Sequence, residues 1–305
     1  MNEPRTSKRS YGIAPPAFRL PDATHVGGVR LQVSDLQRSI AYYQQVLGLA
    51  VYSTTTEAAT LGPHGERHPL LWLQTRSGVV PARLGAIGLY HFAILLPERA
   101  ALGSFATHLS ALGVPAGMAD HLVSESLYLR DPDGLGIEVY ADRPPNAWRQ
   151  HDRELLMTTD SLDIEDVIAS AGERAWDGMP SGTTMGHMHL QVGSLDEAEA
   201  FYHVALGFDK TVWNYPGALF LAAGGYHHHL GTNVWSSRPP ATGDEARLVE
   251  WDLVVPQRDD PSAAARSVRA AGYVAEDIDD GCAVVDPWGT RLRIVAPRRR
   301  TASGS

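Results

Sequence analysis

The stretch LQVSDLQRSIAYYQQVLGL, residues 31–49, recurs as LQVGSLDEAEAFYHVALGF, residues 190–208, at an offset of 159. Further along, DPDGLGIEV, residues 131–139, matches DPWGTRLRI, residues 286–294, at an offset of 155. Self-similarity at a nearly fixed spacing is the signature of a duplicated architecture. The chain therefore consists of two homologous halves.

Each half divides again into two units with the same order of elements. An apolar, β-branched strand is followed by a polar cap, an amphipathic helix ending at glycine, and three short strands. In residues 190–208, Ser194 predicts the start of the helix and Gly207 its left-handed end. One unit alone leaves a face of its curved sheet uncovered, so two must pair. We predict an α+β fold of four βαβββ modules, with the two modules of each half paired into one of two tandem domains.

The boundary between the halves is marked by ADRPPNAWRQHD, which begins at Ala141 and is rich in proline and polar residues. Proline neither continues a helix nor donates to a sheet. The segment that follows, SLDIEDVIASAGERAW, has the cap and apolar spacing of a short connecting helix, with Ser161 as the expected cap. The predicted division is a flexible tail 1–20, a domain 21–145, a linker 146–182, a domain 183–297 and a tail 298–305.

Composition narrows the class of protein. The 305 residues are 44% hydrophobic and 20% charged, which is typical of a globular protein, and the apolar runs are too short to cross a bilayer. The net charge of −9, without a long basic run, argues against nucleic acid as a partner. Cys282 is the only cysteine, so no internal disulfide forms, and the N-terminus lacks the apolar stretch of a secretory signal. We expect a soluble cytoplasmic protein with no membrane partner.

Three stretches resemble a known family: GLYHFAILLP from Gly88, DHLVSESLYLRDPDGLGIEVYADRP from Asp120, and GGYHHHLGTNVW from Gly224. Together with the module order they resemble the vicinal oxygen chelate superfamily, which includes glyoxalase I, bleomycin-resistance proteins and extradiol dioxygenases. The likeness is to the two-domain catechol 2,3-dioxygenase group in particular. The resemblance implies that each domain has a cavity with four ligand positions, on the first and last strands of its two modules.

Mapped onto the first half, these positions hold few ligands. Gly28 stands on the opening strand, where many relatives have a histidine, while His91 and Glu138 occupy two of the other positions. Catalytic metal sites usually have three protein ligands. We therefore expect this half to be mainly structural, with His91 and Glu138 a hydrogen-bonded vestige in preference to a second metal site.

Mapped onto the second half, the positions hold His187, His229 and Glu250, with Arg293 in the fourth. Two histidines and a carboxylate are the facial set of non-haem Fe(II) oxygenases. The resemblance thus predicts a metal site of His187, His229 and Glu250 holding Fe(II), with Mn(II), Zn(II) and Ni(II) as alternatives. A purely structural ion pair between Glu250 and Arg293 is the competing interpretation.

Strand alternation supports this cavity independently of the family. If His187 faces inward then so does His189, and if His229 does then so does His227, whereas His228 points away. Imidazoles on an inner face are costly in ordinary core and favour a polar, metal-containing cavity. We predict His227 or His189 as the acid–base residue. The candidate substrate-binding residues are Tyr226, Asn233, Arg293 and Trp213.

By resemblance, the leading function is an extradiol dioxygenase that cleaves a catechol-like aromatic diol with Fe(II) and O2. The first rival is a glyoxalase-like isomerase or hydrolase using the same ligands without oxygen. The second is a metal-free protein that binds an aromatic compound or antibiotic. Members of this family often form oligomers, so a homo-oligomer is compatible with the sequence, but no residue determines the state.

Overall fold

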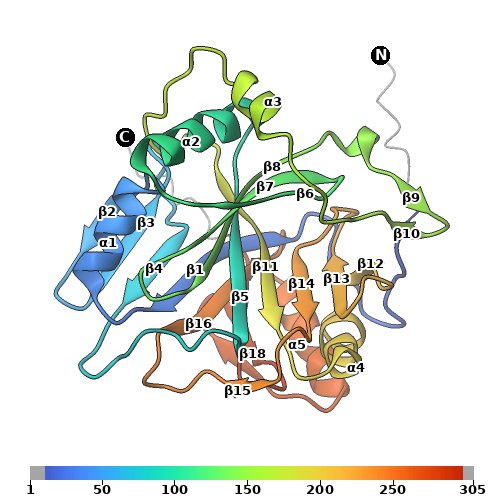
Figure 1. Cartoon of the computed structure of the whole chain (residues 1–305). Coiled ribbons are helices and arrows are strands. Elements are labelled where there is room, and N and C mark those ends of the chain that lie inside the picture. Colours follow the sequence, from blue (N-terminus) through green and yellow to red (C-terminus); the bar gives the residue numbers. More distant parts are fainter. Residues whose placement is uncertain (1–10, 298–305) are drawn as a thin grey trace, which may run out of the picture.

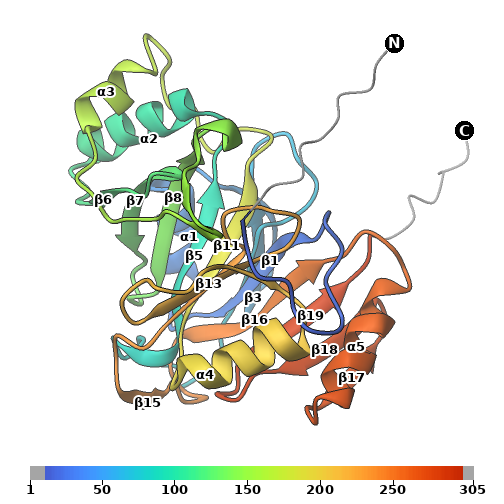
Figure 2. The same cartoon turned by 90° about the vertical axis from the view of Figure 1, so that its right-hand side faces the viewer.

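The structure, a computed structural model, describes residues 11–297 and consists of two large β-sheets with helices at their periphery (Figures 1 and 2). The predicted α+β class and the four βαβββ modules are confirmed. None of the helices in the described part of the chain is long and apolar enough to span a bilayer.

The elements follow the chain in four modules. Module 1 comprises β1 (His25–Gln32), α1 (Leu36–Gln45), β2 (Ala50–Thr54), β3 (Ala58–Gly62) and β4 (Leu71–Gln74). Module 2 comprises β5 (Ala86–Leu95), α2 (Arg99–Leu112), β6 (Gly117–Asp120), β7 (Ser124–Arg130) and β8 (Gly136–Asp142). Module 3 comprises β11 (Thr184–Gln191), α4 (Leu195–Ala198), a π-helical turn η2 (Glu199–Ala205), β12 (Asp209–Val212), β13 (Ala218–Ala222) and β14 (Leu230–Asn233). Module 4 comprises β16 (Arg247–Val254), α5 (Asp260–Ala270), β17 (Ala275–Ile278), β18 (Gly281–Val285) and β19 (Arg291–Val295).

Shorter elements connect the modules. The linker between modules 2 and 3 contains a 3-10 turn η1 (Pro145–Ala147), the hairpin of β9 (Gln150–His151) and β10 (Glu154–Leu155), and α3 (Ile164–Ala169). Strand β15 (Arg238–Pro240) precedes module 4 and pairs with β5. The cap of α3 is Asp163, whose carboxylate accepts from the backbone N–H of Asp166, and not Ser161 as predicted.

The two sheets do not correspond to the two halves of the sequence. The nine-stranded sheet runs β12-β13-β14-β11-β5-β8-β7-β6, with β15 paired to β5, so it joins modules 2 and 3. The eight-stranded sheet runs β17-β18-β19-β16-β1-β4-β3-β2 and joins modules 1 and 4. The prediction that modules pair within each half is therefore wrong. The first strands of modules from opposite halves pair antiparallel, β5 with β11 and β1 with β16.

Hydrogen bonds still connect the two modules of each half. The hydroxyl of Tyr43 on α1 donates to Asp131, in the turn before β8, at 2.9 Å. Its repeat counterpart Tyr202 donates to Asp286, in the turn before β19, at 2.8 Å. All four side chains are buried, and buried polar groups need such partners. Each half therefore bridges the two sheets.

The helix of module 3 starts and ends where the sequence predicts. The Ser194 hydroxyl accepts from the backbone N–H of Glu197, and Gly207 takes a φ of +95° after the last turn. The second part of the helix widens into the π-helical turn η2. This helix packs its buried aromatic residues Phe201 and Tyr202 against the core.

Part of the predicted flexible tail 1–20 is built into the fold. Residues 1–10 and the predicted tail 298–305 lie outside the described residues. Residues 11–20 pack against module 3, where Ile13 forms a bridge with Lys210 and Arg19 makes two hydrogen bonds to Asp209. Leu20 is fully buried. The prediction of a flexible tail is wrong for residues 11–20.

Candidate metal centre

Three side chains converge at the middle of the nine-stranded sheet. Its adjacent strands β11, β5 and β8 present His187, His91 and Glu138 respectively. One carboxylate oxygen, Oε2 of Glu138, lies 3.0 Å from His91 Nε2 and 3.1 Å from His187 Nε2. The potential ligand atoms of all three residues lie within 4.8 Å of one another. Two imidazoles and one carboxylate thus meet at one point.

Burial determines the charge of this cluster. The three residues are at most 5% exposed. Burial lowers the pKa of His91 and of His187, so both rings are neutral at pH 7. Burial alone would raise the pKa of Glu138, but the adjacent His187 and His91 imidazoles hold its pKa well below the ordinary range. The result is a buried anion surrounded by neutral nitrogen ligands, which is the donor set a divalent transition metal prefers.

Unused hydrogen-bonding capacity remains around the cluster. The Ser126 hydroxyl on β7 donates to the second carboxylate oxygen of Glu138 at 2.6 Å, which orients the carboxylate. His91 Nε2, His187 Nδ1 and His189 Nε2 are buried without a hydrogen-bond partner among residues 11–297. Buried polar atoms without partners are rare in native proteins. The residues present therefore fit a metal with open coordination positions.

The cluster forms one wall of a cavity of about 280 Å³. Aromatic side chains dominate the other walls, and the cluster and the cavity together contain no lysine or arginine. His189, two residues along β11 from His187, also faces the cavity. The aromatic walls are Tyr90, Tyr128, Tyr215, Phe220 and Trp235. A planar apolar ring fits such a lining.

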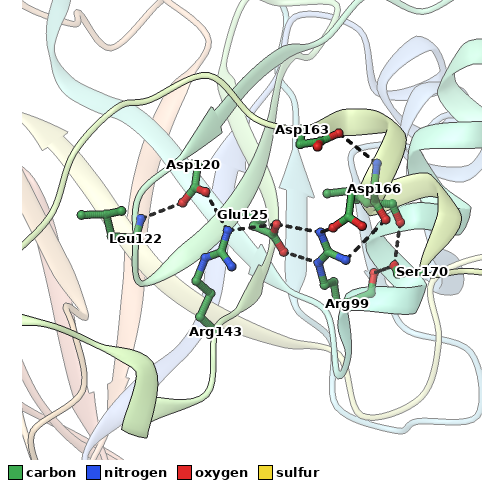
Figure 3. Close-up of polar contacts among 9 residues, drawn as sticks. Arg99, Asp120, Leu122, Glu125, Arg143, Asp163, Asp166 and Ser170 are labelled. Atoms are coloured by element: carbon green, nitrogen blue, oxygen red, sulfur yellow. Dashed lines mark hydrogen bonds and ion pairs between the residues drawn. The ribbon is translucent and has the colours of Figure 1, made fainter.

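The linker between the halves closes the cavity on one side. Residues 157–159 line it, and Asp160 makes two backbone hydrogen bonds to Asp120 at the end of β6. A buried carboxylate, Glu125 on β7, binds Arg99 through both oxygens and Arg143 through one, and Arg143 also pairs with Asp120 (Figure 3). Arg99 also pairs with Asp166 on α3, so this network holds the linker helix against module 2.

A histidine and a tyrosine are coupled at this wall. His121 Nδ1 donates to the backbone carbonyl of Thr158 at 2.5 Å, which leaves Nε2 as an acceptor. The Tyr128 hydroxyl lies 2.6 Å from that Nε2 and therefore donates to it. Burial raises the pKa of Tyr128 well above its usual value. The phenol oxygen is left with lone pairs at the edge of the cavity.

A second chain of groups reaches the cavity through His228. His227 Nε2 donates to the Asp142 carboxylate at 2.8 Å. His227 Nδ1 and His228 Nδ1 lie 2.7 Å apart and share a hydrogen bond. Burial lowers the pKa of His228 well below its usual value, so this ring is neutral and one of its two nitrogens is unprotonated. The His228 ring lines the cavity and lies 4.1 Å from the His187 ring, centroid to centroid.

The structure does not bring the three predicted metal ligands together. Of His187, His229 and Glu250, only His187 lies in the cluster. His229 Nδ1 instead accepts from the backbone N–H of Ala223, and its ring stacks on Tyr226. Glu250 lies on β16 of the other sheet. The prediction that these three share one site is wrong because it assumed that consecutive modules share a sheet.

The predicted alternation fails along residues 226–229. Strand β14 begins only at Leu230, and residues 226–229 form an irregular connection after the turn at Gly224 and Gly225. His228 therefore faces the cavity that His227 and His229 were predicted to face. Alternation applies only to extended backbone, and a turn before the strand removes it.

Three predicted substrate-binding residues are near the cavity without lining it. The Tyr226 hydroxyl is hydrogen-bonded to that of Tyr140 at 2.7 Å. Trp213 packs on the core, with its backbone N–H held by Glu154, and buried Asn233 accepts from the backbone of Trp235. The fourth, Arg293, lies on β19 of the eight-stranded sheet.

The eight-stranded sheet has a charge network where the nine-stranded sheet has the cluster. The repeat offsets pair His91 with Glu250 and Glu138 with Arg293. Glu250 binds Arg30 at 3.2 Å and Arg291 at 3.1 Å, and Arg293 lies 4.0 Å from Glu250. The structural alternative for Glu250, an ion-paired role, is thus what the geometry shows.

The residues that sequence reasoning undervalued are His91 and Glu138. The expected hydrogen bond between them is not formed, since His91 Nε2 lies 3.0 Å from Glu138 Oε2 without a hydrogen-bond partner among the described residues, and that same oxygen is hydrogen-bonded to His187 from the other half of the chain. Their signal was present in the sequence, since both occupy ligand positions of their module. His121 and Tyr128 lie in a stretch that carries the family resemblance but were given no role, and His228 was predicted to point away from the cavity.

Comparisons with known proteins agree with this architecture. The family model "Glyoxalase/Bleomycin resistance protein/Dioxygenase superfamily" matches residues 24–139 and 184–294. A Bacillus subtilis protein named "Catechol-2,3-dioxygenase" is 44% identical over 270 residues, covering 87% of this chain and 94% of that protein.

Two solved structures show the same fold at low sequence identity. A putative dioxygenase from Bacillus subtilis superposes with a TM-score of 0.64 at 14% identity, covering 92% of this chain and 86% of that one. Glyoxalase I from Zea mays superposes with a TM-score of 0.53 at 16% identity, covering 90% and 92%. With both halves matched by the family model, the chain belongs to the glyoxalase, bleomycin-resistance protein and dioxygenase superfamily.

Proposed function

We propose that this protein is an extradiol ring-cleaving dioxygenase that acts on a catechol-like aromatic diol with Fe(II) and O2. The observation that carries the proposal is the buried His91–Glu138–His187 cluster at the wall of an aromatic cavity of about 280 Å³. The 44% identical relative named "Catechol-2,3-dioxygenase" supports the same chemistry.

The metal ligands of this proposal are His91, Glu138 and His187, which replace the set predicted from the sequence. If held by these residues, Fe(II) would supply a Lewis-acidic, redox-active centre for the reaction of a vicinal diol with O2. The protein contributes the fixed ligand orientation and an apolar surround that limits access of water. Tyr90, Phe220 and Trp235 would hold the ring by its faces and edges.

Proton transfer is assigned to two groups at the cavity wall. A diol must lose hydroxyl protons as it binds a metal and its ring opens, so a base within the cavity is required. Burial keeps the His228 ring neutral and so able to accept a proton, and the Asp142–His227 chain behind it can stabilise the charge it acquires. Tyr128, backed by His121, offers a second acceptor that can pass its own proton on. In this scheme His227 acts through His228, and His189 is a buried neighbour of the metal.

The test is anaerobic purification, elemental analysis of the metal, and oxygen uptake with catechol. We expect about one iron per chain and oxygen consumption that disappears in His91→Ala and Glu138→Gln but persists in Glu250→Gln. Zinc, nickel or manganese without oxygen uptake would instead indicate the isomerase or hydrolase chemistry. Protein purified without metal that binds an aromatic ligand with intact affinity would indicate a binding protein.

A further inference from the structure

A second cavity adjoins the metal cavity and differs from it in charge. It has a volume of about 360 Å³ and lies among the start of β5, β15, the start of β16 and the turns before β8 and β19. Tyr90 and Trp235, whose ring centroids are 5.5 Å apart, line both cavities and so form a shared wall. We call this second space the arginine cavity.

Three arginines line the arginine cavity, and no aspartate or glutamate does. This is unexpected in a chain with 35 acidic and 26 basic residues. Arg83 is paired with Glu245, at 3.3 Å. In the described part of the chain, neither Arg130 nor Arg247 has a carboxylate within 4.0 Å. Arg130 is exposed to solvent and donates to the Gly134 carbonyl, whereas Arg247 is partly buried.

Arg247 is the more constrained of the two. Its side chain is partly buried, and its Nε is buried without a hydrogen-bond partner among the residues described. Within residues 11–297 its sole hydrogen bond is a long one, 3.4 Å, from Nη1 to the neighbouring carbonyl of Leu248. A guanidinium presents a planar fork of donors that matches a carboxylate, and leaving buried donors unused is costly. A ligand carboxylate would satisfy them.

The rest of the lining suits the organic part of such a ligand. Trp288, Trp235 and Tyr90 offer aromatic surface, while Leu84 and Leu248 are aliphatic. Arg130 also lines a third cavity, which it shares with His91 and Tyr128, so its charge lies in the surroundings of the metal cluster. The metal cavity contains no arginine or lysine of its own.

We propose that the arginine cavity binds the carboxylate of a small aromatic or ring-opened ligand, through Arg247 with Arg130. This rests in part on the proposed function, which offers two sources for that carboxylate. One is an acidic substituent on the diol. The other is the product: cleavage of the carbon–carbon bond beside a hydroxyl-bearing carbon places both atoms of O2 in the product, one in a new carboxyl group, and O2 takes the electrons that the ring loses.

Calorimetry with the purified protein tests the site itself. It compares the binding of phenylacetate with that of its neutral isostere, phenylacetamide. Phenylacetate should bind at least about 10-fold more tightly than phenylacetamide, because hydrogen bonds to a charged group are worth more than neutral ones. Arg247→Gln should abolish this preference, Arg247→Lys should retain part of it, and Arg130→Gln should reduce it. Arg266→Gln, an equal change of charge on the exposed side of α5, is the matched control and should behave as wild type. Equal binding of the two probes to wild type, or a preference that survives in both Arg247→Gln and Arg130→Gln, would overturn the proposal.

Oxygen uptake then identifies the source of the carboxylate. If it is a substituent, Arg247→Gln should lower kcat/KM for a carboxymethyl-substituted catechol relative to 4-methylcatechol about 10-fold. If the carboxylate belongs to the product, Arg247→Gln should instead raise the inhibition constant of the ring-opened product of catechol about 10-fold. No change in either would overturn the link between this cavity and the reaction. Absence of oxygen uptake with every catechol would contradict the proposed function while leaving the phenylacetate result interpretable.

Discussion

The two sheets of this protein place different chemistry on equivalent strands. In the nine-stranded sheet, His187, His91 and Glu138 meet beside an open cavity. Their repeat counterparts in the eight-stranded sheet are Gly28, Glu250 and Arg293. In the eight-stranded sheet the Glu250 carboxylate is neutralised by arginines. In the nine-stranded sheet the Glu138 carboxylate lies among neutral imidazoles and the Ser126 hydroxyl. Both sheets therefore share the same scaffold, but only the nine-stranded sheet has the set of metal-ligand residues.

The difference extends to the space between the strands. A Cβ built on Gly28 would lie 1.8 Å from the Trp72 ring, so Trp72 occupies the volume that a histidine at position 28 would need. The guanidinium of Arg30 lies over the same ring at 4.5 Å. In the other sheet the counterpart of Trp72 is Gly231, which lies beside the His189 ring and leaves room for it. Trp72 therefore fills space in the eight-stranded sheet that its counterpart Gly231 leaves open in the nine-stranded sheet.

The largest effect on metal content and activity should come from replacing the carboxylate of the nine-stranded sheet, compared with replacing its counterpart in the other sheet. Glu138→Gln removes the anion from the cluster, and we expect metal loss and a fall in kcat/KM of about 10³-fold or more, corresponding to ~4 kcal/mol. Glu250→Gln removes the equivalent charge from the other sheet and should leave the metal content unchanged while costing about 1 kcal/mol of stability. Elemental analysis and urea unfolding measure both. Metal loss in Glu250→Gln with metal retained in Glu138→Gln would reverse the assignment.

The next effect concerns the histidine next to the cluster. His228→Gln removes the proposed base, whose repeat counterpart is Pro69, and should lower kcat about 100-fold with the metal retained. His229→Gln is the matched control, since it alters the adjacent ring that does not line the cavity. A larger loss of kcat in His229→Gln than in His228→Gln would show that the turn places these rings differently.

Opening the filled site should cost stability without creating activity. Trp72→Ala removes a half-buried ring that packs against Gly28 and Arg30, and should lower the free energy of unfolding by about 2 kcal/mol. The metal content should not rise, because Glu250 stays paired with its arginines. A second metal equivalent in this variant would show that Trp72 alone blocks the site.

The smallest effect is a difference in acid sensitivity. Burial lowers the pKa of His229 to about 3, so the folded state keeps this ring neutral while the unfolded state protonates near pH 6.5. Its stability contribution is therefore fully present above pH 6.5 and is lost as the pH falls toward 3, by about 1 kcal/mol at pH 5.5. Urea unfolding between pH 7 and 5.5 should show a shallower decline for His229→Gln. An unchanged slope would contradict the neutral, buried state of His229.

The sequence predicted local features well because they depend on near neighbours. The repeat from Leu31, the cap at Ser194 and the stop at Gly207 each follow from residues within one turn or one module. The same is true of His187 as an inward-facing residue. These inferences need no knowledge of which strands meet.

The pairing of modules could not be inferred in this way. β5 is apolar enough to pair with any of the other first strands, and its choice of β11 decides that His91 and Glu138 join His187. Assigning Glu250 instead required consecutive modules to share a sheet. The sequence also could not show which of the three histidines at residues 227–229 faces the cavity. That depends on where the irregular connection ends and β14 begins, at Leu230, and no residue type marks that point.

The most direct test of the account is to locate the bound metal by anomalous X-ray diffraction at its absorption edge. The account predicts one peak within about 2.3 Å of a histidine nitrogen of both His91 and His187 and of a Glu138 oxygen. A peak at His229, or in the eight-stranded sheet beside Glu250, would contradict it.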